Sequence, residues 1–170
     1  GIDTAHPDRS RTPARVLAFG EVSAVLAFDS VPGAENWVIK RLPVFVTEDE
    51  ARSHKELAAR YVDLIARAAG VDVQPTEFSI VPARPGLVVF YAAQQRLPPA
   101  HIGSAVLRWA SDAECLVFFD AVLQRVEKVW LFNRTNGNGL ELALDSQLSN
   151  WAIVSQEDNP RITPDTPLAY

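Results

Sequence analysis

The first half of the chain alternates short apolar runs with polar turns, a pattern typical of a sheet of short strands. Segment 15–28 holds two apolar runs separated at Gly20, which predicts an antiparallel pair of strands. Trp37–Leu42 predicts a third strand that Pro43 should end, because proline donates no hydrogen bond to a neighbouring strand. The other β-prone runs are 76–81 and 87–93, joined by a turn rich in proline and glycine.

Apolar residues at three- and four-residue spacing predict two longer helices. Thr47 and Glu50 form the pattern of a capping box, so the first helix should begin there. Ser111 and Glu114 form a second such pattern, which should start a long amphipathic helix ending near Arg134. A short helix is expected at 101–109. In the first helix the core-facing positions should be Leu57, Ala58, Tyr61, Leu64, Ile65 and Ala68.

Polar segments divide the chain into three parts. Residues 1–14 contain two prolines and show no periodicity, so we expect a loosely docked N-terminal arm. A polar connector at 94–99 marks the expected boundary between an N-terminal lobe, residues 15–95, and a C-terminal lobe, residues 96–170. Strands followed by helices make the expected fold class α+β.

Composition narrows the classes of partner. The chain has 170 residues, of which 48% are hydrophobic and 22% charged, enough to bury a core in one domain or in two small lobes. The net charge is −5 without a basic stripe, so neither nucleic acid nor a membrane is an expected partner. No apolar run is long enough to span a bilayer, and we expect a cytoplasmic protein. A single cysteine and three scattered histidines predict neither an internal disulfide nor a zinc site.

Two polar residues near the end of the chain carry the candidate chemistry. Asp145 and Asn150 lie five residues apart between the apolar, strand-like segments 140–144 and 151–154. A carboxylate can orient a hydroxyl nucleophile and an amide can hold a divalent cation, which is what phosphoryl transfer needs. By themselves the two residues are also typical of turns that they cap with their own side chains. Lys40, which interrupts an apolar strand, is either an edge residue or a cation held for an anionic ligand.

The order of these elements resembles the protein-kinase-like superfamily, and most closely its small-molecule kinases such as the aminoglycoside and choline phosphotransferases. The resemblance covers residues 16–170. Asp145 to Asn150 matches the D-x-x-x-x-N motif, segment 37–40 is similar to the V-A-I-K strand, and Asp165 follows fifteen residues after Asn150. The resemblance implies a two-lobed fold, with a five-stranded antiparallel sheet and one helix first. An incomplete, mainly helical C-terminal lobe with a catalytic-loop hairpin would follow.

The resemblance also implies roles for individual residues. Lys40 would contact the α- and β-phosphates of ATP, and Asp145 would orient a substrate hydroxyl or accept its proton. Asn150 and Asp165 would hold Mg²⁺. The glutamate that pairs with Lys40 would be Glu56 by its separation along the chain or Glu50 by helical phase. Gly20 would lie in the loop over the phosphates. Gln94 and Gln95 would lie in the hinge that receives the adenine.

The implied activity is an ATP- and Mg²⁺-dependent phosphotransferase that phosphorylates a hydroxyl of a small molecule. The alternative is an inactive, pseudokinase-like module for nucleotide binding or protein interaction. Several positions depart from the family pattern: the phosphate loop has one glycine, Ala143–Leu144 replaces the usual histidine, and Thr166–Pro167 follows Asp165. The chain also ends five residues after Asp165, where such enzymes continue, so it is either cut or a reduced module. The acceptor and the oligomeric state stay open.

Overall fold

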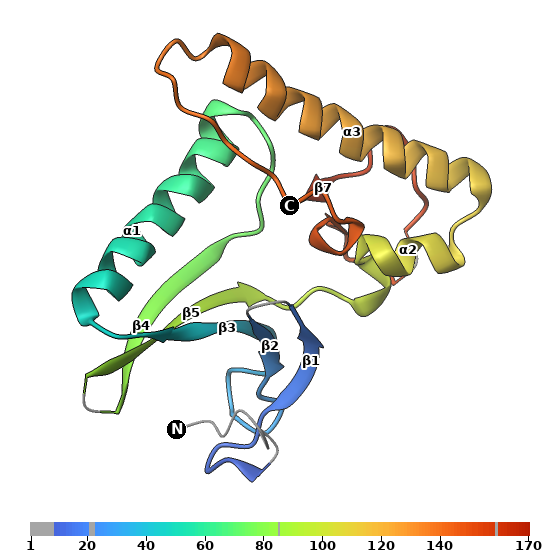
Figure 1. Cartoon of the computed structure of the whole chain (residues 1–170). Helices are drawn as coiled ribbons and strands as arrows, with labels where there is room; N and C mark the ends of the chain where they lie inside the picture. Colours follow the sequence, from blue (N-terminus) through green and yellow to red (C-terminus); the bar gives the residue numbers. More distant parts are fainter. Residues whose placement is uncertain (1–8, 21–22, 85, 159) are drawn as a thin grey trace. The chain divides into compact units, whose positions relative to one another are not determined.

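The computed structural model describes residues 9–20, 23–84, 86–158 and 160–170. The chain forms two compact units (Figure 1). Unit 1 comprises Gly1–Ala59 and Pro75–Arg96, and unit 2 comprises Arg60–Gln74 and Leu97–Tyr170. The expected α+β class, with an antiparallel N-terminal sheet and several helices, is confirmed. Most of the expected N-terminal arm lies outside the described residues.

Unit 1 is built on a five-stranded antiparallel sheet with the strand order β1-β2-β3-β5-β4. Its strands are β1 (Arg15–Phe19), β2 (Ala24–Ala27), β3 (Trp37–Phe45), β4 (Thr76–Arg84) and β5 (Leu87–Gln95). The expected end of β3 at Pro43 is wrong, since the strand continues to Phe45. Its register with β5 shifts between Arg41 and Val44, so the residue without an amide hydrogen lies at an irregularity in the ladder.

The first helix, α1 (Glu48–Asp63), begins as expected. The Glu50 amide donates to Thr47 Oγ1 over 3.1 Å, which satisfies one free donor of the first turn. The expected core stripe is wrong at Leu57, which is 64% exposed, whereas Ala51 is fully buried. The His54 ring contacts Phe90 at 4.9 Å between centroids, so this side of α1 faces the sheet.

A π-helical turn follows α1 directly. It spans Leu64–Ala68, and its wider turn changes the phase of the side chains relative to a continuous α-helix. Ile65 is fully buried, as expected, while Ala68 is exposed. Glycine ends the helical segment as predicted, because Gly70 has a φ of 67°, in the left-handed region that favours glycine.

Unit 2 is mainly helical. Besides the end of α1 and the π-helical turn, its elements are η3 (Pro99–His101), α2 (Gly103–Trp109), α3 (Asp112–Thr135), η4 (Leu148–Asn150), β6 (Ala152–Ile153) and β7 (Leu168–Ala169). The predicted capping box at the start of α3 is confirmed, with Ser111 and Glu114 bonded in both directions. The Ser111 hydroxyl also donates to the Glu114 carboxylate over 2.6 Å, and this bond, together with those from the Ser111 and Ile162 amides, lowers the pKa of the Glu114 carboxyl.

Two strand-like segments of unit 2 form no strand. Segment 140–144 has no strand partner, because the Leu142 amide and carbonyl both bond to the Asn133 side chain, each over 2.8 Å. The apolar pattern predicts a last short strand at 161–163, and this prediction is wrong, because the final strand is Leu168–Ala169, which pairs with β6. The hairpin therefore closes later in the chain than the apolar pattern indicated.

A buried apolar cluster holds unit 2 together. Phe118 of α3, Trp151, Ile153 of β6 and Leu168 of β7 all belong to it, and each is almost completely buried. Gly103 lies beside this cluster, where an added Cβ would collide with the Leu148 carbonyl and approach the Phe118 ring to 2.9 Å. Only glycine therefore fits at the start of α2. No helix in the described ranges is long and apolar enough to cross a membrane.

An ion-pair cluster in unit 1 joins residues from three segments of the chain. Asp29 lies 2.7 Å from Arg15 and 2.9 Å from Arg96, two residues far apart in the sequence. The Arg96 amide also donates to the Asn36 carbonyl over 2.7 Å. The hydrogen bond from Arg15 and the charges of both guanidinium groups hold the pKa of the Asp29 carboxyl below its ordinary value.

We predict that Asp29→Asn lowers the free energy of unfolding at neutral pH, because it removes both ion pairs. A lowered pKa in the folded state stabilises the fold above the unfolded-state pKa, which is about 3.9 for aspartate, and this contribution is lost as the pH falls through the folded-state value. Urea unfolding at pH 7 and pH 3 should therefore show a stability difference that shrinks in acid. Glu35→Gln, at an exposed residue of the same unit, is the control. An equal difference at both pH values would contradict the role of the carboxylate.

Candidate functional site

The segment before Asp145 is held by α3 and by two tyrosines. Asn133 fixes Leu142 as described above, and the Tyr61 hydroxyl donates to the Ala143 carbonyl over 2.7 Å. The Asp145 amide in turn donates to the Tyr170 hydroxyl over 3.1 Å. The backbone thus enters the loop through bonds to residues from three separate parts of unit 2.

The surroundings of the two tyrosines determine how their hydroxyl groups can bond. Tyr170 lies on a backbone ladder with segment 72–74, because its amide donates to the Asp72 carbonyl and its carbonyl accepts from the Gln74 amide, each over 2.9 Å. Burial, followed by the charges of Tyr170 and Asp145, raises the pKa of the Tyr61 hydroxyl well above its ordinary value. Tyr61 therefore stays protonated and acts as a hydrogen-bond donor.

The loop itself is a compact turn. The Gln147 amide donates to Asp145 Oδ1 over 3.1 Å, and Asn150 Nδ2 donates to the Asp145 carbonyl over 3.2 Å. The single turn η4 follows, in which the Trp151 amide donates to the Leu148 carbonyl. The structure thus brings Asp145 and Asn150 together. The same bonds are those expected of turn-capping residues.

The far end of the loop is anchored by α2. The Gly103 amide donates to the Trp151 carbonyl over 2.8 Å, and Ile102 forms an isolated β-bridge with Ala152. Trp151 is fully buried, whereas the Asp145 side chain is exposed and that of Asn150 is half-buried. Both polar side chains therefore lie on a segment whose ends are hydrogen-bonded to other parts of unit 2, and neither side chain is buried.

The chemistry open to this loop follows from its remaining acceptors. Asp145 Oδ2 and Asn150 Oδ1 accept no hydrogen bond from other described residues. A carboxylate and an amide oxygen within one turn can accept a proton from a hydroxyl or contribute oxygen ligands to a hard cation. No group of three His, Cys, Asp or Glu side chains in the described ranges could hold a metal ion unaided.

Asp165 lies in a turn before the second strand of the β6–β7 hairpin. The Thr166 amide donates to the Thr163 carbonyl over 3.0 Å, and the Thr163 amide donates to Thr166 Oγ1 over 2.8 Å. Asp165 is exposed, and within the described residues no hydrogen bond joins it to Asn150 or Asp145. Its role as a second metal ligand therefore stays a prediction.

Lys40 occupies the middle of β3 in unit 1. It pairs with Val25 of β2 and Ala92 of β5, which places it on the same face of the sheet as Phe90, two residues before Ala92. Because His54 packs on Phe90, this is the face that α1 covers. The Lys40 side chain is exposed and forms no ion pair with any described residue.

The two candidate partners of Lys40 lie on different sides of α1. At about 100° per residue, Glu50 lies about 40° from the sheet-facing His54, whereas Glu56 lies about 160° away. Both are exposed, and neither forms an ion pair among the residues with described positions. Helical phase thus favours Glu50 over Glu56.

The structure describes only part of the expected phosphate loop, and it places the expected hinge residues in a strand. Gly20 donates its amide to the Ser23 carbonyl over 2.8 Å and so closes the β1–β2 turn, whose residues 21 and 22 lie outside the description. Gln94 and Gln95 are paired residues of β5, opposite Val38 and Trp37 of β3, so the segment after the strand starts only at Arg96. The Gln94 side chain also donates to Thr76 Oγ1 over 2.8 Å.

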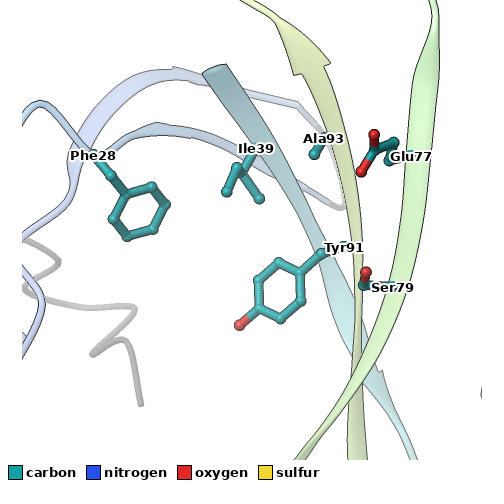
Figure 2. Close-up of a pocket in the computed structure, with 6 residues that line it drawn as sticks. All are labelled: Phe28, Ile39, Glu77, Ser79, Tyr91 and Ala93. Atoms are coloured by element: carbon teal, nitrogen blue, oxygen red, sulfur yellow. The ribbon is translucent and has the colours of Figure 1, made fainter. Parts of the chain in front are cut away.

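Sequence reasoning missed a pocket of about 260 Å³ in unit 1 (Figure 2). Strand alternation places Tyr91 and Ala93 of β5 on the sheet face opposite Lys40. Figure 2 shows Glu77 and Ser79 of β4 beside them. The lining combines apolar side chains with the Ser79 and Tyr91 hydroxyls and one carboxylate, that of Glu77. The full lining is Phe28, Ile39, Glu77, Ser79, Tyr91 and Ala93.

We predict that Tyr61→Phe lowers the free energy of unfolding by about 1–2 kcal/mol, because it leaves the Ala143 carbonyl without its donor while keeping the ring. Urea unfolding would measure the change. Tyr91→Phe is the matched control, since the Tyr91 hydroxyl bonds to no other residue in the described ranges. Equal stability of Tyr61→Phe and the unchanged chain would contradict a structural role for the bond.

Comparison with known proteins gives a family without an assigned activity. No curated protein matches the chain. Residues 7–160, which include most of unit 1 and the Asp145 loop, match a family described as a family of unknown function (DUF6206). The match spans most of the chain, and the protein therefore belongs to this family of unknown function.

Proposed function

We propose that this chain is a kinase-like phosphotransferase module that binds Mg²⁺-ATP and transfers phosphate to a hydroxyl of a small molecule. The observation that carries the proposal is the Asp145–Asn150 turn, in which one hydrogen bond holds the two residues together and leaves a carboxylate and an amide oxygen available. Both ends of the turn are hydrogen-bonded to other segments of unit 2, at Leu142 and at Trp151. Catalysis of phosphoryl transfer depends largely on how the protein positions the reacting groups.

Unit 1 gives independent support. Its five-stranded antiparallel sheet, the helix on one face and the lysine in the middle strand on that face support the proposal that it binds the nucleotide. A lysine without an ion-pair partner among the described residues can hold phosphate oxygens as a point charge. In this proposal Lys40 binds the nucleotide phosphates, and Asp145 orients the acceptor hydroxyl and accepts its proton.

The available donors fit a magnesium ion that arrives with the nucleotide. Mg²⁺ keeps several waters and is usually held by one or two protein oxygens together with substrate phosphates. Asn150 Oδ1 is one such oxygen, since Nδ2 is used in the bond to Asp145. When bound, the ion neutralises phosphate charge. Asp165 is the proposed second ligand.

A pseudokinase-like module without turnover is the alternative function. One observation favours it: neither Glu50 nor Glu56 forms an ion pair with Lys40 within the part of unit 1 that the structure describes. In active kinases this ion pair fixes the lysine that contacts the phosphates. A lysine without it can still bind nucleotide while being poorly placed for transfer.

Nucleotide binding should appear as a rise in the melting temperature of the chain when ATP and Mg²⁺ are titrated. A ligand present at 100 times its dissociation constant stabilises the folded state by about 2.7 kcal/mol. Lys40→Ala should remove most of this rise, because it removes the cation. Arg41→Ala is the matched control, a neighbouring cation on the opposite face of β3. The absence of a rise with any nucleotide would reject both the enzyme and the nucleotide-binding alternative.

The same titration tests the metal ligands. Asp165→Asn should abolish the magnesium dependence of the rise if Asp165 holds the ion. An unchanged dependence would remove Asp165 from the site and leave Asn150 as the only assigned ligand.

Phosphate transfer separates the enzyme from the pseudokinase. We predict that Asp145→Asn keeps the nucleotide-dependent rise in melting temperature but lowers transfer at least about 100-fold, because a neutral amide cannot accept the hydroxyl proton. ³¹P NMR of ATP with a panel of small hydroxyl compounds would measure transfer. Nucleotide binding without transfer to any acceptor would support the pseudokinase. Equal transfer by Asp145→Asn and the unchanged chain would exclude Asp145 as the base.

A further inference from the structure

The long helix α3 carries a second apolar face. Phe118, Ala121, Val122 and Val129 are buried in the core of unit 2. On the opposite side Leu116 is 71% exposed, and Leu123 and Trp130 are each 63% exposed. A soluble helix normally presents polar residues on this side. An exposed apolar face of this kind is typical of a surface that binds another molecule.

The exposed residues form one straight stripe. Leu116, Leu123 and Trp130 follow one another at seven-residue spacing, so they lie at nearly the same angle around the helix axis. Phe119, also exposed, lies one turn after Leu116 on the same side. Seven-residue spacing of apolar positions is the pattern by which one helix packs lengthwise against another. α3 has 24 residues and is about 36 Å long, which gives such a contact ample length.

The charges at the ends of the stripe identify the partner. Asp112 and Arg134 lie on the stripe side, eleven residues before and after Leu123, and both are exposed. Neither forms an ion pair with any other described residue. If a second α3 packed antiparallel across a two-fold axis at Leu123, Leu116 would face Trp130 of the copy, and Asp112 would face Arg134 of the copy. The stripe is thus complementary to itself in both apolar contact and charge.

We propose that the Leu116–Leu123–Trp130 face of α3 binds a second copy of this chain, with the two helices antiparallel and Leu123 on the two-fold axis. The pairing joins Leu116, Leu123 and Trp130 along its centre, with the exposed Glu127 at the edge of the stripe, and opposite charges at its two ends. It also places the positive end of each helix macrodipole beside the negative end of the other. The parallel arrangement would bring Asp112 beside Asp112 and Arg134 beside Arg134, and is therefore disfavoured.

Sedimentation velocity of the full 170-residue chain over a range of concentrations should show a monomer–dimer equilibrium. Leu123→Asp places two carboxylates against each other at the axis, and we expect it to raise the dissociation constant by about 30-fold or more. Leu57→Asp is the matched control, since Leu57 is 64% exposed on α1 and lies outside the stripe. Circular dichroism checks that both variants fold. A chain that stays monomeric at every concentration overturns the proposal, as does a dimer that survives Leu123→Asp.

The antiparallel geometry is tested by cross-linking and charge reversal. In a Cys115→Ser background, Leu123→Cys should be joined to its copy by a short bismaleimide, while Leu57→Cys should not. Asp112→Arg and Arg134→Asp should each weaken the dimer, and the two together should restore it. Failure of the Leu123→Cys cross-link in a chain that dimerises would move the interface elsewhere and reject the proposal. A double reversal no tighter than the single ones would also reject the antiparallel pairing.

Discussion

The close approach of α2 to the segment around Trp151 is the constraint on which unit 2 depends. The Gly103 amide bonds to the Trp151 carbonyl, and the absence of a side chain on Gly103 lets the Leu148 carbonyl lie against it. Trp151 can then be fully buried while the residues just before it stay at the surface. At the other end Asn133 of α3 holds Leu142 through both of its backbone groups. The Asp145 loop is a short span between two fixed points, so its conformation follows from the fold around it.

Local patterns in the sequence predicted the elements that depend on neighbouring residues. The capping box of Ser111 and Glu114 lies within one turn, and the helix it begins was placed within a residue or so of its observed ends. Elements that depend on distant partners were missed. The pairing of Leu168 with Ile153 needs the buried cluster of unit 2, and nothing in residues 161–169 separates the true strand from the expected one. Proline normally ends a strand, but the tolerance of β3 for Pro43 depends on the register of β5.

The candidate site also combines features that depend on neighbouring residues with features that depend on distant ones. Asp145 and Asn150 are only five residues apart in the sequence, so the hydrogen bond that joins them is a local feature of one turn. The bonds from Tyr61 and Tyr170 to the loop could not be predicted, since these residues lie far from it in the sequence and no pattern links them. The ion pairs of Asp29 with Arg15 and Arg96 could not be predicted for the same reason. Separation along the chain predicts Glu56 as the partner of Lys40, and helical phase predicts Glu50. The contact of His54 with Phe90 shows which side of α1 meets the sheet, and it favours Glu50.

The long helix shows why periodicity alone cannot separate folding from association. Phe118 and Phe119 are adjacent apolar residues, yet the first is fully buried in the core and the second is exposed. In the sequence both residues fit one amphipathic face, because a helix that is apolar on two sides has the same pattern as a helix with a single wide apolar stripe. The two faces have different consequences for stability: the inner one is buried when unit 2 folds, and the outer one can be buried only when another surface covers it. Asp112 and Arg134 stabilise the ends of α3 through the macrodipole in either state, so their charges serve the single helix as well as an antiparallel pair.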